Sequence, residues 1–441
     1  IDYTTCCAAI PNTENDDSLG FPLGMAVSSD GATLYVAGFG SSEVGVYDTA
    51  QLEADTFTPN AANQIGVTGG GPTGLVLDEV RSQLYVLTRF DDAISVVSTG
   101  TGNELAHVTL HNPEPDSVKV GRPFLYDTSL TSSHGDSACA SCHIFGDFDS
   151  LAWDLGDPDG DVVNNPGPFT IVIGDPDFHP MKGPMTTQSL RGMANHGPMH
   201  WRGDRTGGND GPSGQPNGGT FNEVEAFTKF NPAFEGLIGR SAQLTPTEMQ
   251  AFTDFILQVM YPPNPIRNLD NSLTPNQATA ETKFFGPISD AIANCDGCHK
   301  TDRNASPGEG LRRGFFGGDG RSSFEAETQH FKIPHLRNMY QKVGMFGLPS
   351  VAGINPGNNG FLGDQIRGFG FLHDGSIDTL LRFHNGAVFN QSGGNPGGFP
   401  AGPAGDVQRF QMEVLMMAFD TNLLPIVGQQ LIEAIRDVIA G

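Results

Sequence analysis

Cys139-Ala-Ser-Cys142-His143 and Cys295-Asp-Gly-Cys298-His299 are two stretches of the same form, C-x-x-C-H. Two such cysteines followed directly by a histidine are typical of covalent attachment of c-type haem, with the histidine as an iron ligand. A tetrahedral zinc site could use the same four sulfurs, but it would not need a histidine after each pair. We therefore expect two haem c groups, with zinc as the alternative. The predicted attachment and ligating residues are Cys139, Cys142, His143, Cys295, Cys298 and His299.

The composition of the 441-residue chain is strongly acidic, with 50 Asp and Glu against 24 Lys and Arg and a net charge of -26. A polyanion would be repelled by this charge, so nucleic acid is excluded as a partner. No apolar run approaches the roughly 18 residues of a membrane span. Haem c is normally attached outside the cytoplasm, so the motifs predict a secreted protein, periplasmic or extracellular. The start at Ile1 without a Met predicts a mature or excised product.

An internal repeat with an offset of 50 residues occupies the first hundred residues. Leu34-Tyr-Val36 recurs as Leu84-Tyr-Val86, and apolar and polar residues alternate around both stretches between Gly- and Asp-rich turns. This alternation predicts β-strands, and a repeat of this length built from short strands favours propeller blades. A third unit is predicted from Pro115 on, where Phe124-Leu-Tyr126 matches the L-Y-V strand. The P-x-G, S-S-D-G-x-x-L-Y-V and V-x-V-Y-D stretches resemble YVTN-type β-propellers.

Two and a half blades cannot close a ring, because closed propellers have about four or more. The missing blades are expected either upstream in a longer precursor or in another chain. A small β-sandwich of another kind is the alternative for this segment.

Two capping boxes predict helices in the remainder of the chain, where glycine-rich loops separate short helical patterns. Thr245-Pro-Thr-Glu248 predicts a helix over 246–260, and Thr274-Pro-Asn-Gln277 opens a helix that leads toward the second haem motif.

The fold class expected from these patterns is multidomain β + α. Partial β-propeller blades that form an incomplete ring are expected over 1–116. Two mostly α, cytochrome-c-like haem domains are expected over 117–262 and 263–441, each with one C-x-x-C-H motif.

Met199 and Met345 each lie eight residues beyond the Arg of a Leu-Arg pair, one in each predicted haem domain. Cytochromes c often take a Met or His from a downstream loop as the sixth iron ligand, so both are candidates. The alternative is that they fill gaps in the core, which is the commoner use of Met. Histidines compete for the same role, among them His179 and His384.

Four stretches resemble bacterial dihaem cytochrome c peroxidases and MauG-like enzymes. Gly370-Phe-Leu-His-Asp-Gly-Ser376, preceded by Ile333-Pro-His-Leu-Arg-Asn338, is similar to the family's P-x-L-R-N … P-Y-x-H-D-G-S signature. Pro198-Met-His-Trp-Arg-Gly203 resembles its F-W-D-G-R segment, and His179-Pro-Met-Lys-Gly-Pro184 resembles H-x-x-x-K-G-P. The resemblance covers about residues 117–400.

This resemblance implies roles for four residues. His179 matches the displaceable distal ligand of the N-terminal haem, and Trp201 matches the tryptophan that relays electrons between the haems. Glu235 lies one position out of register with the distal acid that moves a proton during peroxide cleavage. His384 lies near the position of the family's C-terminal haem ligand, which is a Met or Tyr.

The predicted function is that of a peroxidase-like oxidoreductase. Electrons from a small redox protein would pass from the C-terminal haem to an N-terminal haem that reduces peroxide or a related oxidant. One alternative is a non-catalytic electron-transfer cytochrome in which both irons are permanently six-coordinate. Another is a partner-docking subunit of a larger redox assembly.

Asp157-Pro-Asp-Gly-Asp161 places three carboxylates at alternate positions around a glycine. Hard cations take several oxygen ligands from such a tight turn, so Asp157, Asp159 and Asp161 are candidate ligands for Ca²⁺. The family that the chain resembles also holds a calcium ion, by other residues. An acidic surface turn is the alternative.

Overall fold

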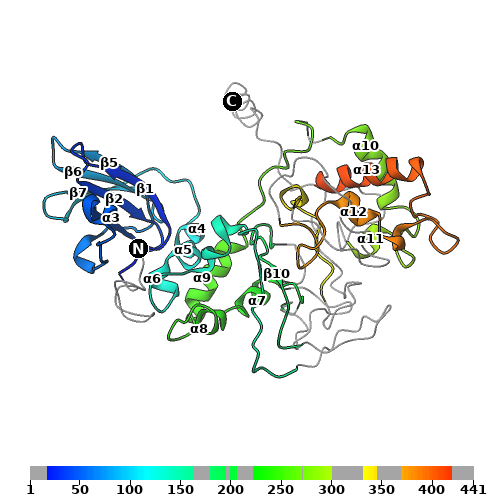
Figure 1. Cartoon of the computed structure of the whole chain (residues 1–441), viewed down its shortest axis with the longest axis horizontal. Helices are drawn as coiled ribbons and strands as arrows, with labels where there is room; N and C mark the ends of the chain where they lie inside the picture. The colour runs from blue at the N-terminus through cyan, green and yellow to red at the C-terminus, as the bar shows by residue number, and fades with distance from the viewer. Residues whose placement is uncertain are drawn as a thin grey trace. The chain divides into compact units, whose positions relative to one another are not determined.

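The computed structural model describes residues 17–162, 179–194, 199–203, 205, 222–270, 272–299, 331–344 and 369–419 (Figure 1). The chain divides into two compact units, Ile1–Gly146 with Thr228–Gln258 (unit 1) and Asp147–Phe227 with Val259–Gly441 (unit 2). The three domains expected from the sequence stay a prediction. Within the described residues, no helix has both the length and the apolar character needed to cross a membrane.

The two sequence repeats form two four-stranded antiparallel sheets in unit 1, drawn in blue in Figure 1. Sheet 1 consists of β1 (Pro22–Val27), β2 (Thr33–Gly38), β3 (Glu43–Asp48) and β4 (Gln64–Gly66). Sheet 2 consists of β5 (Pro72–Asp78), β6 (Gln83–Thr88), β7 (Ala93–Ser98) and β8 (Glu104–Thr109). Leu34 pairs with Tyr47 as Leu84 pairs with Val97, so the offset of 50 also holds in the register of the strands. The strand prediction is confirmed.

Sheets 1 and 2 pack on each other through an apolar core. Gly24 in β1 lies so close to β5 that a Cβ atom there would be 2.2 Å from the Thr73 carbonyl oxygen. Only glycine allows this approach of the two backbones. The buried core residues are Tyr35, Val44, Ile65, Val67, Leu84, Val86 and Val97.

The segment after β8 folds as short helices, so the third strand unit expected around Phe124–Tyr126 is wrong. The helices are α4 (Asp116–Gly121), α5 (Pro123–Tyr126) and α6 (Thr128–Thr131). Pro123 lacks the N–H that a ladder would need, and its fixed φ suits the first turn of a helix. The Phe124 ring then packs on Phe252 of α9, with ring centroids 6.3 Å apart.

Both capping boxes are present. Helix α9 (Pro246–Ile256) begins after Thr245, which accepts from the Glu248 N–H, and it ends four residues before the expected end at 260. Helix α10 (Pro275–Phe284) begins after Thr274 in the same way. Further short helices are α3 (Thr49–Glu53), α7 (Glu223–Thr228), α8 (Ala233–Gly236), η1 (Ala61–Asn63), η3 (Ile144–Gly146), η4 (Met339–Gln341) and η5 (Ala387–Phe389).

Unit 2 has a helical core around α10, α12 (Leu380–His384) and α13 (Pro403–Met417), together with a small ladder of β9 (Ala152–Trp153) and β10 (Met185–Thr186). The buried residues of this core include Phe284, Leu336, Ile377, Phe399, Met412, Leu415 and Phe419. The described chain is therefore a mixed β and α protein, as the sequence predicts.

Candidate functional site

The first C-x-x-C-H motif forms the 3₁₀ helix η2 (Cys139–Ser141) in unit 1. The Ala138 N–H donates to Ser141 Oγ at 3.0 Å, and the His143 N–H donates to the Cys139 carbonyl oxygen at 3.0 Å. These bonds wind the motif into one turn, which packs against α5. Burial raises the pKa of the Cys139 thiol to about 12.

The second motif forms the one-turn helix α11 (Cys295–Cys298) in unit 2. His299 follows directly, and its Nδ1 donates to the Pro334 carbonyl oxygen at 2.8 Å. A histidine that donates from Nδ1 presents Nε2 as the metal-binding atom, and such a bond to a backbone carbonyl fixes the ring. The same hydrogen bond is common among histidines that bind a metal through Nε2.

The four cysteines of the two motifs are thiols and form no disulfide. Cys295 packs against the apolar core of unit 2, and burial raises its pKa to about 11. In the part of the chain that the structure describes, no three His, Cys, Asp or Glu side chains gather as a metal-binding group. Two thiols on one helical turn followed directly by an oriented imidazole are a donor set that fits haem c.

Trp201 is buried, with 6% of its surface exposed. Its Nε1–H donates to the Thr186 carbonyl oxygen at 2.7 Å, and its side chain packs with Met185 and Phe331. The Lys332 N–H donates to the Trp201 carbonyl oxygen at 2.9 Å. The four residues from Phe331 to Pro334 therefore connect the surroundings of Trp201 with the carbonyl group that holds His299.

The H-D-G-S segment contacts the residues that surround Trp201 in unit 2. His373 stacks on Phe331 with ring centroids 3.9 Å apart, and the Thr186 N–H donates to the His373 carbonyl oxygen at 2.6 Å. The structure thus brings together three of the stretches that carry the family resemblance, although they lie far apart in the sequence.

Lys342 is a residue of this region that sequence reasoning missed. Its Nζ lies 5.7 Å from the centroid of the Trp201 ring, and burial lowers the pKa of Lys342 to about 8. No motif includes Lys342, and only the fold brings it to the tryptophan.

His384 ends α12 and is 2% exposed. Three rings surround it, those of Phe383, Phe389 and Phe399, with centroids 5.6–5.9 Å from that of the imidazole. Its Nδ1 has no hydrogen-bond partner in the described structure. Burial, followed by the charge of Arg409, lowers the pKa of His384 to about 3. The imidazole is therefore neutral, and Phe399 belongs to the same core as the one that Cys295 packs against.

The remaining candidates differ in exposure. Met199 is 2% exposed, whereas His179 is exposed and its Nδ1 accepts from the Met181 N–H at 3.1 Å. Glu235 lies exposed on α8 in unit 1. Met345 lies outside the described residues. Ligation or proton transfer by these residues stays a prediction.

The acidic turn of unit 2 is an exposed Asx turn. Asp157 Oδ1 accepts from the Asp159 N–H at 3.0 Å, and the Gly160 N–H donates to the Asp157 carbonyl oxygen. The carboxylates of Asp157, Asp159 and Asp161 do not gather into a metal-binding group within the described residues. Calcium binding here stays a prediction.

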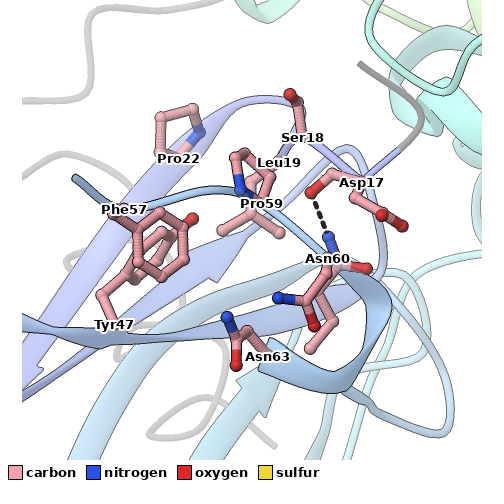
Figure 2. Close-up of a pocket in the computed structure, with 10 residues that line it drawn as sticks. Asp17, Ser18, Leu19, Pro22, Tyr47, Phe57, Pro59, Asn60 and Asn63 are labelled. Atoms are coloured by element: carbon pink, nitrogen blue, oxygen red, sulfur yellow. Dashed lines mark hydrogen bonds between the residues drawn. The ribbon is translucent and has the colours of Figure 1, made fainter. Parts of the chain in front are cut away.

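A cavity of about 220 Å³ lies on sheet 1, and none of the predicted site residues lines it (Figure 2). The Tyr47 and Phe57 rings form one wall, with centroids 4.8 Å apart. Gln64 Nε2 donates to the Asp17 carbonyl oxygen at 2.5 Å at its edge.

No protein-family model matches the chain, and no curated protein matches it. Among solved structures, a hydrazine synthase of Kuenenia stuttgartiensis is 19% identical over 70% of this chain and 89% of that chain, with a TM-score of 0.40. A periplasmic gluconolactonase of Pseudomonas aeruginosa is 22% identical over 22% of this chain and 28% of that chain, with a TM-score of 0.19. A putative 6-phosphogluconolactonase of Bacteroides uniformis is 14% identical over 21% and 27%, with a TM-score of 0.18. Similarities at these TM-scores do not establish a shared fold.

Proposed function

We propose that this chain is a secreted c-type cytochrome that holds two covalent haems and acts as a peroxidase-like oxidoreductase. The observation that carries the proposal is the second motif. Cys295 and Cys298 lie on one helical turn, and the bond from His299 to Pro334 turns Nε2 into the metal-binding atom. When bound, haem supplies one-electron exchange and, at an open iron, a place for peroxide.

The residues that hold the haems are the four motif cysteines with His143 and His299 as proximal ligands. We assign His384 as the sixth ligand on the C-terminal side, because it is buried, neutral and has an unpartnered nitrogen in the core that Cys295 adjoins. Met345 is the competing candidate on that side. Met199 and His179 are the candidates on the N-terminal side.

Trp201 serves as an electron relay in this proposal. Its ring packs with Phe331, and three residues further along the chain Pro334 holds His299. The bond from Nε1 to Thr186 and the surrounding apolar side chains keep the indole rigid and dry. Electrons from a small redox protein would therefore have a packed and hydrogen-bonded path from the C-terminal motif to the indole.

His179 and Glu235 would act on the peroxide side. His179 is exposed, so its displacement would cost little buried contact. Glu235 would accept and return a proton at a carboxylate oxygen during cleavage of the O–O bond.

A non-catalytic electron-transfer cytochrome is the second candidate function. The burial of Met199 favours it, because a buried sulfur could cap an iron permanently. The exposure of Glu235 also favours it, because an exposed carboxylate is poorly placed to retain a proton in a dry site.

Peroxide consumption by the haem-loaded chain, together with absorption and electron paramagnetic resonance spectra during partial reduction, separates the two functions. The peroxidase proposal predicts peroxide turnover and the loss of one strong ligand when the protein is half reduced. Trp201→Phe is expected to slow turnover at least tenfold with both haems retained. Trp153→Phe is the matched control, because Trp153 is 41% exposed and lies on the β9 ladder. Two irons that stay six-coordinate, without peroxide turnover, would establish the electron-transfer function instead.

A further inference from the structure

In the part of the chain that the structure describes, sheet 2 has one buried and one open face. Strand pairing places Val76, Tyr85 and Val96 side by side on the open face, and Leu87, Ile94 and Val108 beside them. Val76 is 65% exposed and Val108 is 52% exposed. All six side chains carry no charge. A sheet face of this composition is normally covered by another layer.

Among the described residues, sheet 1 has a complementary outer face that is partly open. Leu19 and Phe57 pack on its part around Gly45 and Tyr47, whereas its part along β1 is exposed. Met25 and Val27 alternate along β1 and are 67% and 57% exposed. Leu34 and Tyr47 lie on the same face, because Val27 pairs with Leu34 and Leu34 pairs with Tyr47. The cavity lined by Tyr47 adjoins this face (Figure 2).

Through the offset of 50 residues, the open face of sheet 1 corresponds to the packed face of sheet 2, and the open face of sheet 2 corresponds to the packed face of sheet 1. The equivalents of Met25, Val27 and Leu34 in sheet 2 are Leu75, Leu77 and Leu84, which lie in the core between the sheets. The equivalents of Val76 and Tyr85 in sheet 1 are Ala26 and Tyr35, which lie on the other side of that core. The observed contact between sheets 1 and 2 is therefore a template for the contact that the two open faces would make with each other.

We propose that the two open faces form a head-to-tail contact between copies of this chain, in which sheet 1 of one copy packs on sheet 2 of the next. One chain cannot make this contact with itself, because its sheets 1 and 2 already use their other faces against each other. A second copy offers both complementary faces without any further partner.

A contact between two different faces repeats from copy to copy and can close into a ring. Propellers contain about 4–8 blades, so about two to four copies of this two-sheet unit would complete one. The assembly would also cover all of the apolar sheet faces described above.

Sedimentation velocity and light scattering of the full haem-loaded chain over a range of concentrations test this proposal. We expect the wild-type chain to assemble into a closed oligomer. Val76→Asp and Met25→Asp each put a charge into the contact and are expected to weaken assembly at least tenfold. Both side chains are exposed, so these variants should fold, as circular dichroism can verify. Val80→Asp is the matched control, because Val80 is 95% exposed in the turn after β5 and lies off both faces.

Mixing the two variants gives the sharpest result. Each variant retains the face that the other lacks, so an equimolar mixture should form a dimer that contains one of each and grows no further. A wild-type chain that stays monomeric at every concentration would overturn the proposal and would point to blades from another polypeptide. Unimpaired assembly of either variant alone, or a mixture without the mixed dimer, would also overturn it.

Discussion

His384 either ligates an iron or only packs in the core, and its replacement by leucine distinguishes these two roles. The imidazole is 2% exposed among three phenylalanine rings, and its Nδ1 has no partner in the described structure. An unpartnered buried polar atom costs about 1–3 kcal/mol. Leucine has a similar volume without that polar atom. If His384 only packs, His384→Leu should therefore raise the free energy of unfolding by about 1–3 kcal/mol.

The proposed ligand role predicts the opposite. Loss of a sixth iron ligand removes a bond that exists only in the folded protein, so the free energy of unfolding of the haem-loaded variant should fall. One haem should also change from low spin to high spin in absorption and electron paramagnetic resonance spectra.

The assay is chemical unfolding of the haem-loaded protein alongside those spectra. Phe383→Leu is the control, because it disturbs packing beside the imidazole and leaves the nitrogen atoms in place. An unchanged spectrum combined with a more stable His384→Leu protein would refute the ligand assignment.

Three further predictions concern the fold. Burial would raise the pKa of Glu114, but hydrogen bonds from two arginines lower it to about 2, so its stabilising contribution is present above pH ~4.5 and is lost as the pH falls toward 2. The carboxylate is partly exposed, so solvent screens its ion pairs. We therefore expect Glu114→Gln to lower the free energy of unfolding, measured in urea, by about 1–2 kcal/mol at pH 7 and hardly at all near pH 2. An equal loss at both pH values would contradict the ion-pair explanation. Thr245→Ala removes the N-cap of α9 and should cost about 1 kcal/mol in thermal unfolding, whereas no loss would mean that the cap is dispensable. Gly24→Ala places a Cβ 2.2 Å from the Thr73 carbonyl oxygen and should destabilise unit 1 by more than about 2 kcal/mol, whereas an unchanged melting temperature would contradict the close approach of β1 and β5.

The features that the sequence predicted well depend on neighbouring residues. The repeat around Leu34 and Leu84 predicted the strands, because alternation within one strand is a local property. Thr245 and Thr274 predicted the starts of two helices, because a capping box spans only four residues. The strand predicted at Phe124–Tyr126 from its similarity to L-Y-V was wrong, because Pro123 favours the start of a helix over a strand.

The geometry of the site could not be predicted, because it depends on contacts between distant segments. The bond from His299 to Pro334 joins residues 35 positions apart. The approach of Lys342 to Trp201 joins residues that no common motif includes. The open faces of the two sheets became recognisable only when the strand register could be combined with the repeat.

The central claim is that both C-x-x-C-H motifs carry covalent haem, and the mass of the intact denatured protein tests it most directly. Protein produced by export through a cell that attaches haem c should carry a mass increase of two haems, and its alkaline pyridine spectrum should be that of haem with two thioether bonds. Cys139→Ser with Cys142→Ser, or Cys295→Ser with Cys298→Ser, should each leave one haem. A chain that carries no covalent haem after such production, and instead retains zinc on the four thiols, would contradict the account.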